Sequence, residues 1–410
     1  MRIVIFGLAI SSSWGNGHAA LWRGLVSALL EAGHGVTFFE RDVSYYAANR
    51  DLAELPAGGR LVLYREWDDA AAPRALAEAD VGLVTSYCPD AAAARRAVCD
   101  SAVLRCFYDL DTPVTLARLA AGETVDYVAG GLGIAEGLGA YDLVLSYTGG
   151  PALAALRERL GARRVAALYG SVDPALHGPA AAAPGPAGRL SYLGTYAPDR
   201  QAALEALFVA PARARPEMRF VLGGAQYPPD FPWTANMFFL RHVPPPEHPA
   251  FYASSRLTLN VTRQAMAEMG WCPSGRLFEA ASCGCPVLSD AWDGLDAFFA
   301  PGEEILIARD TAEALAAIEL DNATLTRIAA RARERTLAEH TAARRAQQMV
   351  AAFEEARHGG EDAAAEAATG AHRDGDAGTN GERGVAADAA GMADAVAGAG
   401  MAPAAAGAGD

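Results

Sequence analysis

The stretch from Cys272 to Asp290 places a helix cap, a glycine, an arginine and a glutamate within two helical turns. Ser274 suits the N-cap of a helix, and Gly275 lets a ligand approach the backbone closely. Arg276 falls in the first turn, where a guanidinium opposes the helix dipole unless an anion binds beside it. One turn further on, Glu279 can hold the cis diol of a ribose. The spacing therefore predicts a site for a nucleotide diphosphate.

Two features of this prediction have simpler alternatives. Arg276 and Glu279 could form an exposed ion pair three residues apart, worth only about 0.2–0.5 kcal/mol. A second loop with Gly194 and Thr195 follows an apolar strand and opens a helix, so it could also cradle a phosphate. That loop lacks the G-x-G-x-x-G spacing and could be a plain strand-to-helix turn.

Three side chains in the N-terminal half of the chain could take a proton from an acceptor hydroxyl. Asp109 and Asp111 follow an apolar strand, and alternation predicts that both point to one side at its carboxyl end. His18 stands at the start of a helix, directly after a small polar loop. Each group also has a structural alternative, because Asp111 could cap the next helix and His18 could be part of a cap.

These candidates lie at the ends of apolar runs that alternate with helical patterns, which predicts an α/β fold with two doubly wound, parallel-sheet, Rossmann-like domains. We expect an N-terminal acceptor-side domain over 1–170, a linker over 171–188, a C-terminal donor domain over 189–324 and helices over 325–357. Ligands bind at the carboxyl ends of such sheets, so the two domains would face each other across a cleft. The runs are Ile3–Phe6, Val36–Phe39, Val81–Thr85, Leu104–Tyr108, Leu143–Tyr147, Val165–Leu168, Leu190–Leu193, Phe220–Leu222, Phe238–Leu240, Leu257–Val261 and Pro286–Leu288.

The composition and net charge of the chain limit which kinds of molecule it can bind. The 410 residues are 51% hydrophobic, which is enough for two full cores, and the net charge of −15 disfavours nucleic acid by Coulomb repulsion. The chain contains no lysine, so each fixed side-chain cation is an arginine. Residues 358–410 are mostly Ala, Gly, Asp and Glu, a composition that predicts a disordered acidic tail.

The cysteines and the apolar runs predict a cytoplasmic protein. The six cysteines form no C-x-x-C pair and no metal-binding spacing, so we expect reduced core thiols. The first apolar run is about as long as one strand, which is too short for a signal sequence. Nowhere do about 18 apolar residues follow one another, so we expect no transmembrane segment.

Several of these segments resemble the CgeB-like (spore-maturation-type) glycosyltransferases, which have the GT-B fold. The likeness covers about residues 189–320, and the N-terminal domain also looks like that of family members. The segments that carry it are LNVTR (259–263), PSGRLFEAASCGCPV (273–287), Asp293–Leu295, Phe298–Phe299, Pro301–Ile305 and, in the N-terminal domain, YDLDTPVT (108–115).

The resemblance implies roles for individual residues. Glu279 would contact the donor ribose, while Arg263, Ser274 and Arg276 would face the diphosphate. Many retaining relatives place a second glutamate eight residues before the ribose glutamate, and that position here is Trp271. The lysine that often neutralises the leaving diphosphate is also absent, which leaves this task to arginine.

The resulting prediction is a glycosyltransferase that moves a sugar from a nucleotide diphosphate sugar to an unidentified acceptor hydroxyl, and we expect the donor to be UDP-linked. We expect no cofactor and no required metal ion. Two alternatives stay open: a nucleotide-sugar epimerase of the same fold, and a non-catalytic sugar-nucleotide-binding or coat-assembly protein.

Overall fold

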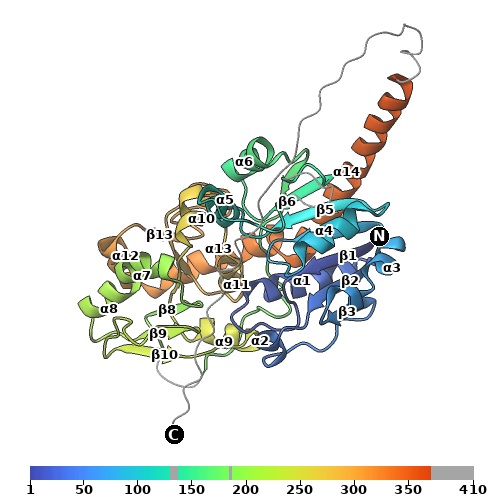
Figure 1. Cartoon of the computed structure of the whole chain (residues 1–410). Helices are drawn as coiled ribbons and strands as arrows, with labels where there is room; N and C mark the ends of the chain where they lie inside the picture. The colour runs from blue at the N-terminus through green and yellow to red at the C-terminus, as the bar shows by residue number, and fades with distance from the viewer. Residues whose placement is uncertain (130–136, 184–186, 371–410) are drawn as a thin grey trace. The chain divides into compact units, whose positions relative to one another are not determined.

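The computed structural model describes residues 1–129, 137–183 and 187–370. The chain divides into two compact units, Met1–Asp362 and Ala363–Asp410. The first unit contains two parallel β-sheets, one of seven and one of six strands, with helices on both faces of each (Figure 1).

The first sheet has the strand order β3-β2-β1-β4-β5-β6-β7, and all of its pairings are parallel. Its central strands form because runs such as Ile3–Phe6 are apolar on both faces and are buried on both. The strands are β1 (Arg2–Gly7), β2 (Gly35–Arg41), β3 (Gly59–Tyr64), β4 (Val81–Thr85), β5 (Leu104–Asp109), β6 (Leu143–Ser146) and β7 (Val165–Ala167). The helices between them are α1 (Gly17–Glu31), α2 (Ser44–Ala47), α3 (Ala72–Ala77), α4 (Ala91–Cys99), α5 (Thr112–Ala120) and α6 (Pro151–Leu160).

The second sheet repeats this plan with the order β10-β9-β8-β11-β12-β13. Its strands are β8 (Leu190–Leu193), β9 (Phe220–Gly223), β10 (Met237–Leu240), β11 (Thr258–Asn260), β12 (Val287–Asp290) and β13 (Leu306–Ala308). Its helices are α7 (Gln201–Leu204), α8 (Ala210–Ala214), α9 (His248–Ala253), α10 (Gln264–Met269), α11 (Gly275–Ser282) and α12 (Thr311–Glu319), with a π-helical turn between α7 and α8.

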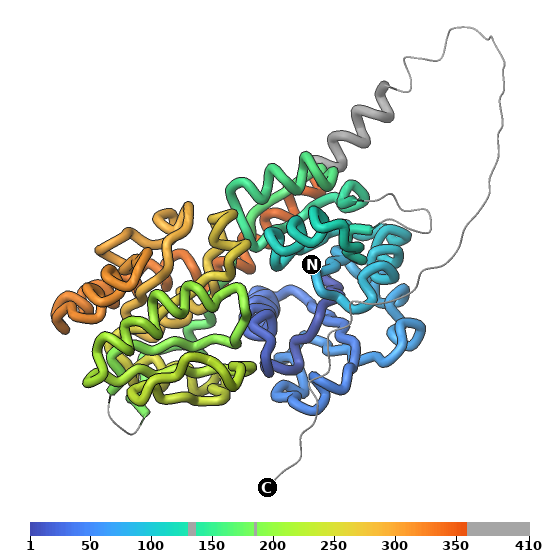
Figure 2. Tube along the Cα trace, turned by 60° about the vertical axis from the view of Figure 1, so that its left-hand side comes forward, coloured from blue at the N-terminus to red at the C-terminus, as the bar shows by residue number. Residues whose placement is uncertain are grey.

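The last two helices, α13 (Asn322–Glu339) and α14 (Ala342–Gly370), take the chain back to the first sheet. The two domains are joined here, because Val172 accepts a hydrogen bond from the Ala342 amide and donates one to the carbonyl of His340. Met349 and Phe353 of α14 are fully buried in the same core cluster as Trp22 of α1. In Figures 1 and 2, α13 (orange) lies on the second domain, where it packs against α11, and the first part of α14 (red) runs beside the first domain.

The prediction of two doubly wound sheets is confirmed, with three differences in detail. The edge strands β3 and β13 were not predicted, since β3 is only half-buried and β13 has three residues. Helix α14 ends at Gly370 and so enters the segment predicted as a disordered tail. The remainder of that segment, 371–410, lies outside the described residues.

All six cysteines are free thiols, five of them buried and Cys99 partly exposed. Of the helices in the described ranges, none combines the length and apolar character needed to cross a membrane.

Candidate donor and acceptor site

A cavity of about 620 Å³ lies between the two sheets of the first unit. Its walls come from loops after β1, β4, β5 and β6 of the first sheet and after β8, β9, β10 and β11 of the second. The carboxyl ends of both sheets therefore face it, which is where open parallel sheets bind ligands. Eight of the nine predicted site residues line it: His18, Asp111, Gly194, Thr195, Arg263, Ser274, Arg276 and Glu279.

His18 and Asp111 meet on the N-terminal wall of the cavity. The Asn16 side chain caps α1 by accepting a hydrogen bond from the His18 amide at 3.1 Å, which fixes the start of the helix. His18 Nε2 then lies 3.7 Å from Asp111 Oδ2, and the ring of Tyr87 stacks on the imidazole with centroids 5.6 Å apart. An imidazole beside a carboxylate can take a proton from a hydroxyl while the carboxylate stabilises the resulting cation.

Asp109 does not line the cavity, so its predicted place as an acceptor contact is corrected. Its side chain is fully buried, and Oδ1 accepts hydrogen bonds from the Asp111 amide at 3.3 Å and from Thr115 Oγ1 at 3.1 Å. Burial, followed by the charge of Asp111, raises the pKa of Asp109 to about 6. Strand β5 ends at Asp109, and strand alternation therefore no longer governs where Asp111 points.

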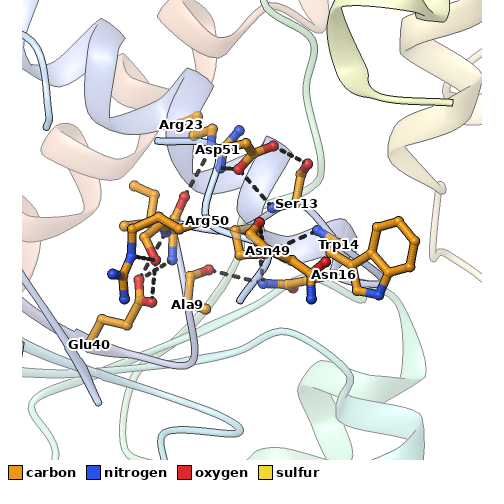
Figure 3. Close-up of polar contacts among 12 residues, drawn as sticks. Ala9, Ser13, Trp14, Asn16, Arg23, Glu40, Asn49, Arg50 and Asp51 are labelled. Atoms are coloured by element: carbon orange, nitrogen blue, oxygen red, sulfur yellow. Dashed lines mark hydrogen bonds and ion pairs between the residues drawn. The ribbon is translucent and has the colours of Figure 1, made fainter. Parts of the chain in front are cut away.

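A network of hydrogen bonds holds the loop before α1 (Figure 3). The fully buried Glu40 accepts from the amides of Ile10 and Ser11 at 2.8 and 2.9 Å and from Ser11 Oγ at 2.5 Å. Asp51 holds the next turn by accepting from the Ser13 amide at 3.1 Å and from Arg23 at 2.5 Å. The loop that carries the Asn16 cap is thus fixed before any ligand arrives.

Helix α11 presents its N-terminus on the opposite wall. The Ser274 side chain accepts from the Arg276 amide at 3.4 Å, as predicted for an N-cap. The Arg276 guanidinium donates to Asn260 Oδ1 at 3.0 Å and lies 5.1 Å from the ring centroid of Tyr192. Within the described part of the chain Arg276 forms no ion pair, so the alternative of a pair with Glu279 is not what the structure shows.

The Gly194 loop lies directly against this arginine. A Cβ at Gly194 would come within 2.8 Å of Arg276 Nη2, and a Cβ at Gly224 within 2.0 Å of the Gly194 carbonyl oxygen. Gly224 therefore lets two backbone segments pack closely, and Gly194 leaves room for the Arg276 side chain at the cavity wall. Arg263 lines the same wall, but its Nε donates to Asp199 at 3.0 Å, so a carboxylate already compensates its charge.

Glu279 faces two histidines that sequence reasoning did not single out. His248 Nδ1 lies 3.7 Å from Glu279 Oε2 and 3.4 Å from Nε2 of the buried His177. Burial by itself would raise the pKa of Glu279, but His177, His248 and Arg276 lower it to about 2. Glu279 is therefore an anion at neutral pH. The ligand atoms of these three residues lie within 4.8 Å of one another.

Trp271, which takes the position of the second glutamate of retaining relatives, joins the two domains. Its amide donates to the Asp293 carbonyl at 2.7 Å, and its carbonyl accepts from the Gly149 amide at 2.9 Å. A Cβ at Gly150 or at Gly294 would come within 2.4 Å of the indole ring. The indole thus fills the space between two glycine backbones, and the position supplies no carboxylate.

Sequence reasoning missed the residues whose role depends on long-range packing. Glu40 and Asp51 lie 29 and 38 residues from the loop residues they hold, Ser11 and Ser13. His177 stands in the predicted linker, 71 residues before His248. None of them belongs to a local motif, so only the strand order, which brings these segments together, could have indicated them.

Comparison with known proteins gives a family model that matches part of the chain and a fold that covers most of it. Residues 200–351 match the family model described as Glycosyl transferase-like. The solved sucrose-phosphate synthase from Thermosynechococcus elongatus is 16% identical with a TM-score of 0.61, over 87% of this chain and 98% of that one. The Anabaena protein Alr3699/HepE in complex with UDP-glucose is 13% identical with a TM-score of 0.62, over 87% and 100% of the two chains. The chain has the GT-B fold.

A third structure extends the set of similar folds. It is an alpha-glucosyltransferase in complex with UDP and a 13-mer DNA, 12% identical with a TM-score of 0.58, over 86% of this chain and 99% of that one. A sequence search of curated proteins finds no match. The family model and the fold together support a GT-B glycosyltransferase.

Proposed function

We propose that this protein transfers a sugar from a nucleotide diphosphate sugar, UDP-linked, to an acceptor hydroxyl. The GT-B fold and the match of residues 200–351 support this class of reaction. The 273–287 motif, with its cap, arginine and glutamate on the cavity wall, supports placing the chain with the CgeB-like enzymes.

The observation that carries the proposal is the environment of Arg276. Its guanidinium lies on the cavity wall with a neutral amide and an aromatic ring as its partners. Glu279 offsets part of this charge from one turn further along α11, but within the described residues it pairs with His248 and not with Arg276, so an anion can still bind there. The N-terminus of α11 beside it adds backbone donors and the positive end of the helix dipole. A diphosphate is an anion that satisfies both features.

The remaining donor contacts follow from this placement. Ser274 and the Gly194–Thr195 loop flank Arg276 and contact the phosphates, with Arg263 as a weaker partner because Asp199 compensates its charge. The ionised Glu279, one turn further along α11, accepts from the ribose hydroxyls. Charge that develops on the leaving diphosphate is stabilised by Arg276 and the helix N-terminus.

The acceptor binds against the N-terminal wall, where His18 takes its proton and Asp111 orients and stabilises the imidazole. This pair lies on the other domain from Arg276, as a single displacement requires of its base. Trp271 supplies no carboxylate at the position where retaining relatives have one. We therefore propose that the anomeric configuration inverts, which NMR of the anomeric proton in the product tests directly.

The proposed reaction requires no metal ion, because guanidinium and helix dipole take the place of a cation at the diphosphate. Activity in excess EDTA should equal that without it, and its complete loss would contradict this part. We also propose a cytoplasmic location, which the six free thiols support.

The first test is thermal denaturation with UDP, GDP, dTDP, CDP and ADP, for the wild type and for Arg276→Ala. A ligand at one hundred times its dissociation constant stabilises a protein by about 2.7 kcal/mol. UDP should raise the midpoint of the wild type and leave that of the variant unchanged. If no nucleotide raises the wild-type midpoint, the donor assignment is wrong.

Incubation with the donor alone separates transfer from its rivals. An epimerase would convert a UDP-sugar into its epimer without an acceptor, and a binding protein would never release UDP. A transferase should release UDP in proportion to the glycosylated acceptor, which mass spectrometry detects.

A further inference from the structure

The cluster His177, His248 and Glu279 has the composition of a three-ligand transition-metal site, and its ligand atoms lie within 4.8 Å of one another. Zinc bound by three ligands at about 2.0–2.2 Å in tetrahedral geometry separates neighbouring ligand atoms by roughly 3.3–3.6 Å. The two closest pairs here are 3.4 Å, between the His177 and His248 nitrogens, and 3.7 Å, between His248 and Glu279. Two imidazoles and a carboxylate are a donor set that zinc binds in proteins.

The surroundings orient the ring of His248 as a metal ligand needs and fix the backbone of His177. His248 Nε2 faces the Val243 carbonyl at 3.1 Å, so that donation of this N–H leaves Nδ1 with a lone pair toward the cluster. His177 is 3% exposed and held through its own backbone, since its carbonyl accepts from Ser282 Oγ and its amide donates to Asp173. The ligand atoms thus come from three segments whose backbones are fixed independently.

The cluster also has an open side. His248 and Glu279 line the cavity, whereas His177 closes the cluster from behind. A bound ion would therefore keep one coordination position toward the cavity, as three-ligand sites do.

We propose that His177 Nε2, His248 Nδ1 and Glu279 bind a divalent ion of the zinc type, and that this ion competes with the nucleotide for Glu279. The competition rests on the proposed function, in which Glu279 holds the donor ribose; the metal site itself does not. An ion bound by Glu279 occupies part of its acceptor capacity and neutralises its negative charge, so fewer and weaker acceptor sites are left for two hydroxyls. Zinc then acts as a reversible inhibitor of donor binding, and chelation restores the donor site.

Zinc affinity is measured on the full chain by competition with a chromophoric zinc indicator, for the wild type and for His177→Gln and His248→Gln. Even loss of a residue that only supports a ligand typically weakens metal binding 10–100-fold, so loss of a ligand should weaken it at least as much. His242→Gln is the matched control, because His242 lines the same cavity, stacks on Trp14 and lies outside the cluster. Equal zinc affinity in the wild type and both cluster variants would overturn the site. So would a loss in His242→Gln as large as in the cluster variants.

A second titration of zinc in saturating UDP tests the competition. The apparent zinc dissociation constant should rise at least tenfold, and zinc should raise that of UDP by the same factor. Unchanged or tighter zinc binding would overturn the competition, the latter by placing the ion on the diphosphate. If UDP does not bind at all, the proposed function fails, while the indicator measurements still decide the metal site.

Discussion

The two sheets share one strand order but hold their functional groups in different ways. On the N-terminal wall, buried carboxylates fix the chain: Glu40 holds the loop before α1, and Asp109 holds the Asp111 amide. On the C-terminal wall, the functional cation Arg276 has a neutral amide and an aromatic ring as partners. One wall is held by internal hydrogen bonds to buried carboxylates, while the other keeps a positive charge that an anionic ligand can still compensate.

This difference suits the two domains to different roles, one to holding a general base and the other to binding the donor. A general base needs precise orientation, so its neighbours are internal hydrogen-bonding partners. A phosphate site needs positive charge that the protein's own carboxylates do not compensate, because an internal ion pair would weaken its attraction for the phosphate. We therefore expect substitutions on the N-terminal wall to change the chemical step or stability, and substitutions on the C-terminal wall to change binding of the donor.

His18→Gln should give the largest effect of the substitutions considered. A positioned general base contributes about 10²–10⁴-fold, so kcat should fall within this range while the thermal shift with UDP stays as in the wild type. Turnover and UDP stabilisation of the same preparation provide the measurement. His242→Gln, at a histidine of the same cavity that packs against Trp14, should keep wild-type kcat. If the variant loses the thermal shift with UDP together with turnover, His18 contacts the donor, and the proposed division of roles between the two walls is wrong.

Arg276→Ala should lower kcat/KM by about 10²–10³-fold, as for the loss of one well-placed donor to a developing anion. It should also abolish the thermal shift with UDP. Arg263→Ala is the matched comparison, and its loss should be smaller because Asp199 already compensates the Arg263 charge at 3.0 Å. Losses of equal size in both variants would show that compensation by Asp199 has no functional weight.

Most of the fold could be predicted from the sequence because buried parallel strands are continuous apolar runs. Leu190–Leu193 and Val81–Thr85 were predicted with the bounds that the structure shows. The missed strands β3 and β13 are at sheet edges, where one side has no strand partner and the pattern is less apolar. Strand order could not be predicted, because it depends on pairings between runs far apart in the sequence.

The candidate site was predictable where one helix carries it. Ser274, Arg276 and Glu279 lie within two turns of α11, so local spacing was sufficient to place them together. The place of Asp109 was mispredicted because alternation was extended past the end of β5. The histidines around Glu279 come from other segments, and a lone histidine gives no signal of its own.

Asp109→Asn should change how stability depends on pH. Burial and the Asp111 charge raise the pKa of Asp109 to about 6, above the unfolded value near 3.9, so the folded state favours the protonated form. The stability that the folded state gains from protonated Asp109 is fully present below about pH 4 and is lost as the pH rises to about 6. From pH 4 to 6.5 the wild type should lose about 2–3 kcal/mol from this group, and the variant should lack that component. Urea denaturation across this range measures it; parallel pH profiles for both proteins would contradict the buried placement.

Glu40→Gln should have a small effect, a destabilisation of about 1–3 kcal/mol in urea denaturation. Two backbone amides and one hydroxyl donate to this carboxylate, and the amide group of glutamine would turn a donor toward some of them. Asp51 holds the same loop, but its side chain is 38% exposed, so solvent can replace its hydrogen bonds. The substitution Asp51→Asn should therefore cost less than about 1 kcal/mol. If Glu40→Gln is no more destabilising than Asp51→Asn, burial is not what fixes this loop. The contrast between a rigid N-terminal wall and a ligand-completed C-terminal wall would then rest on Asp109 alone.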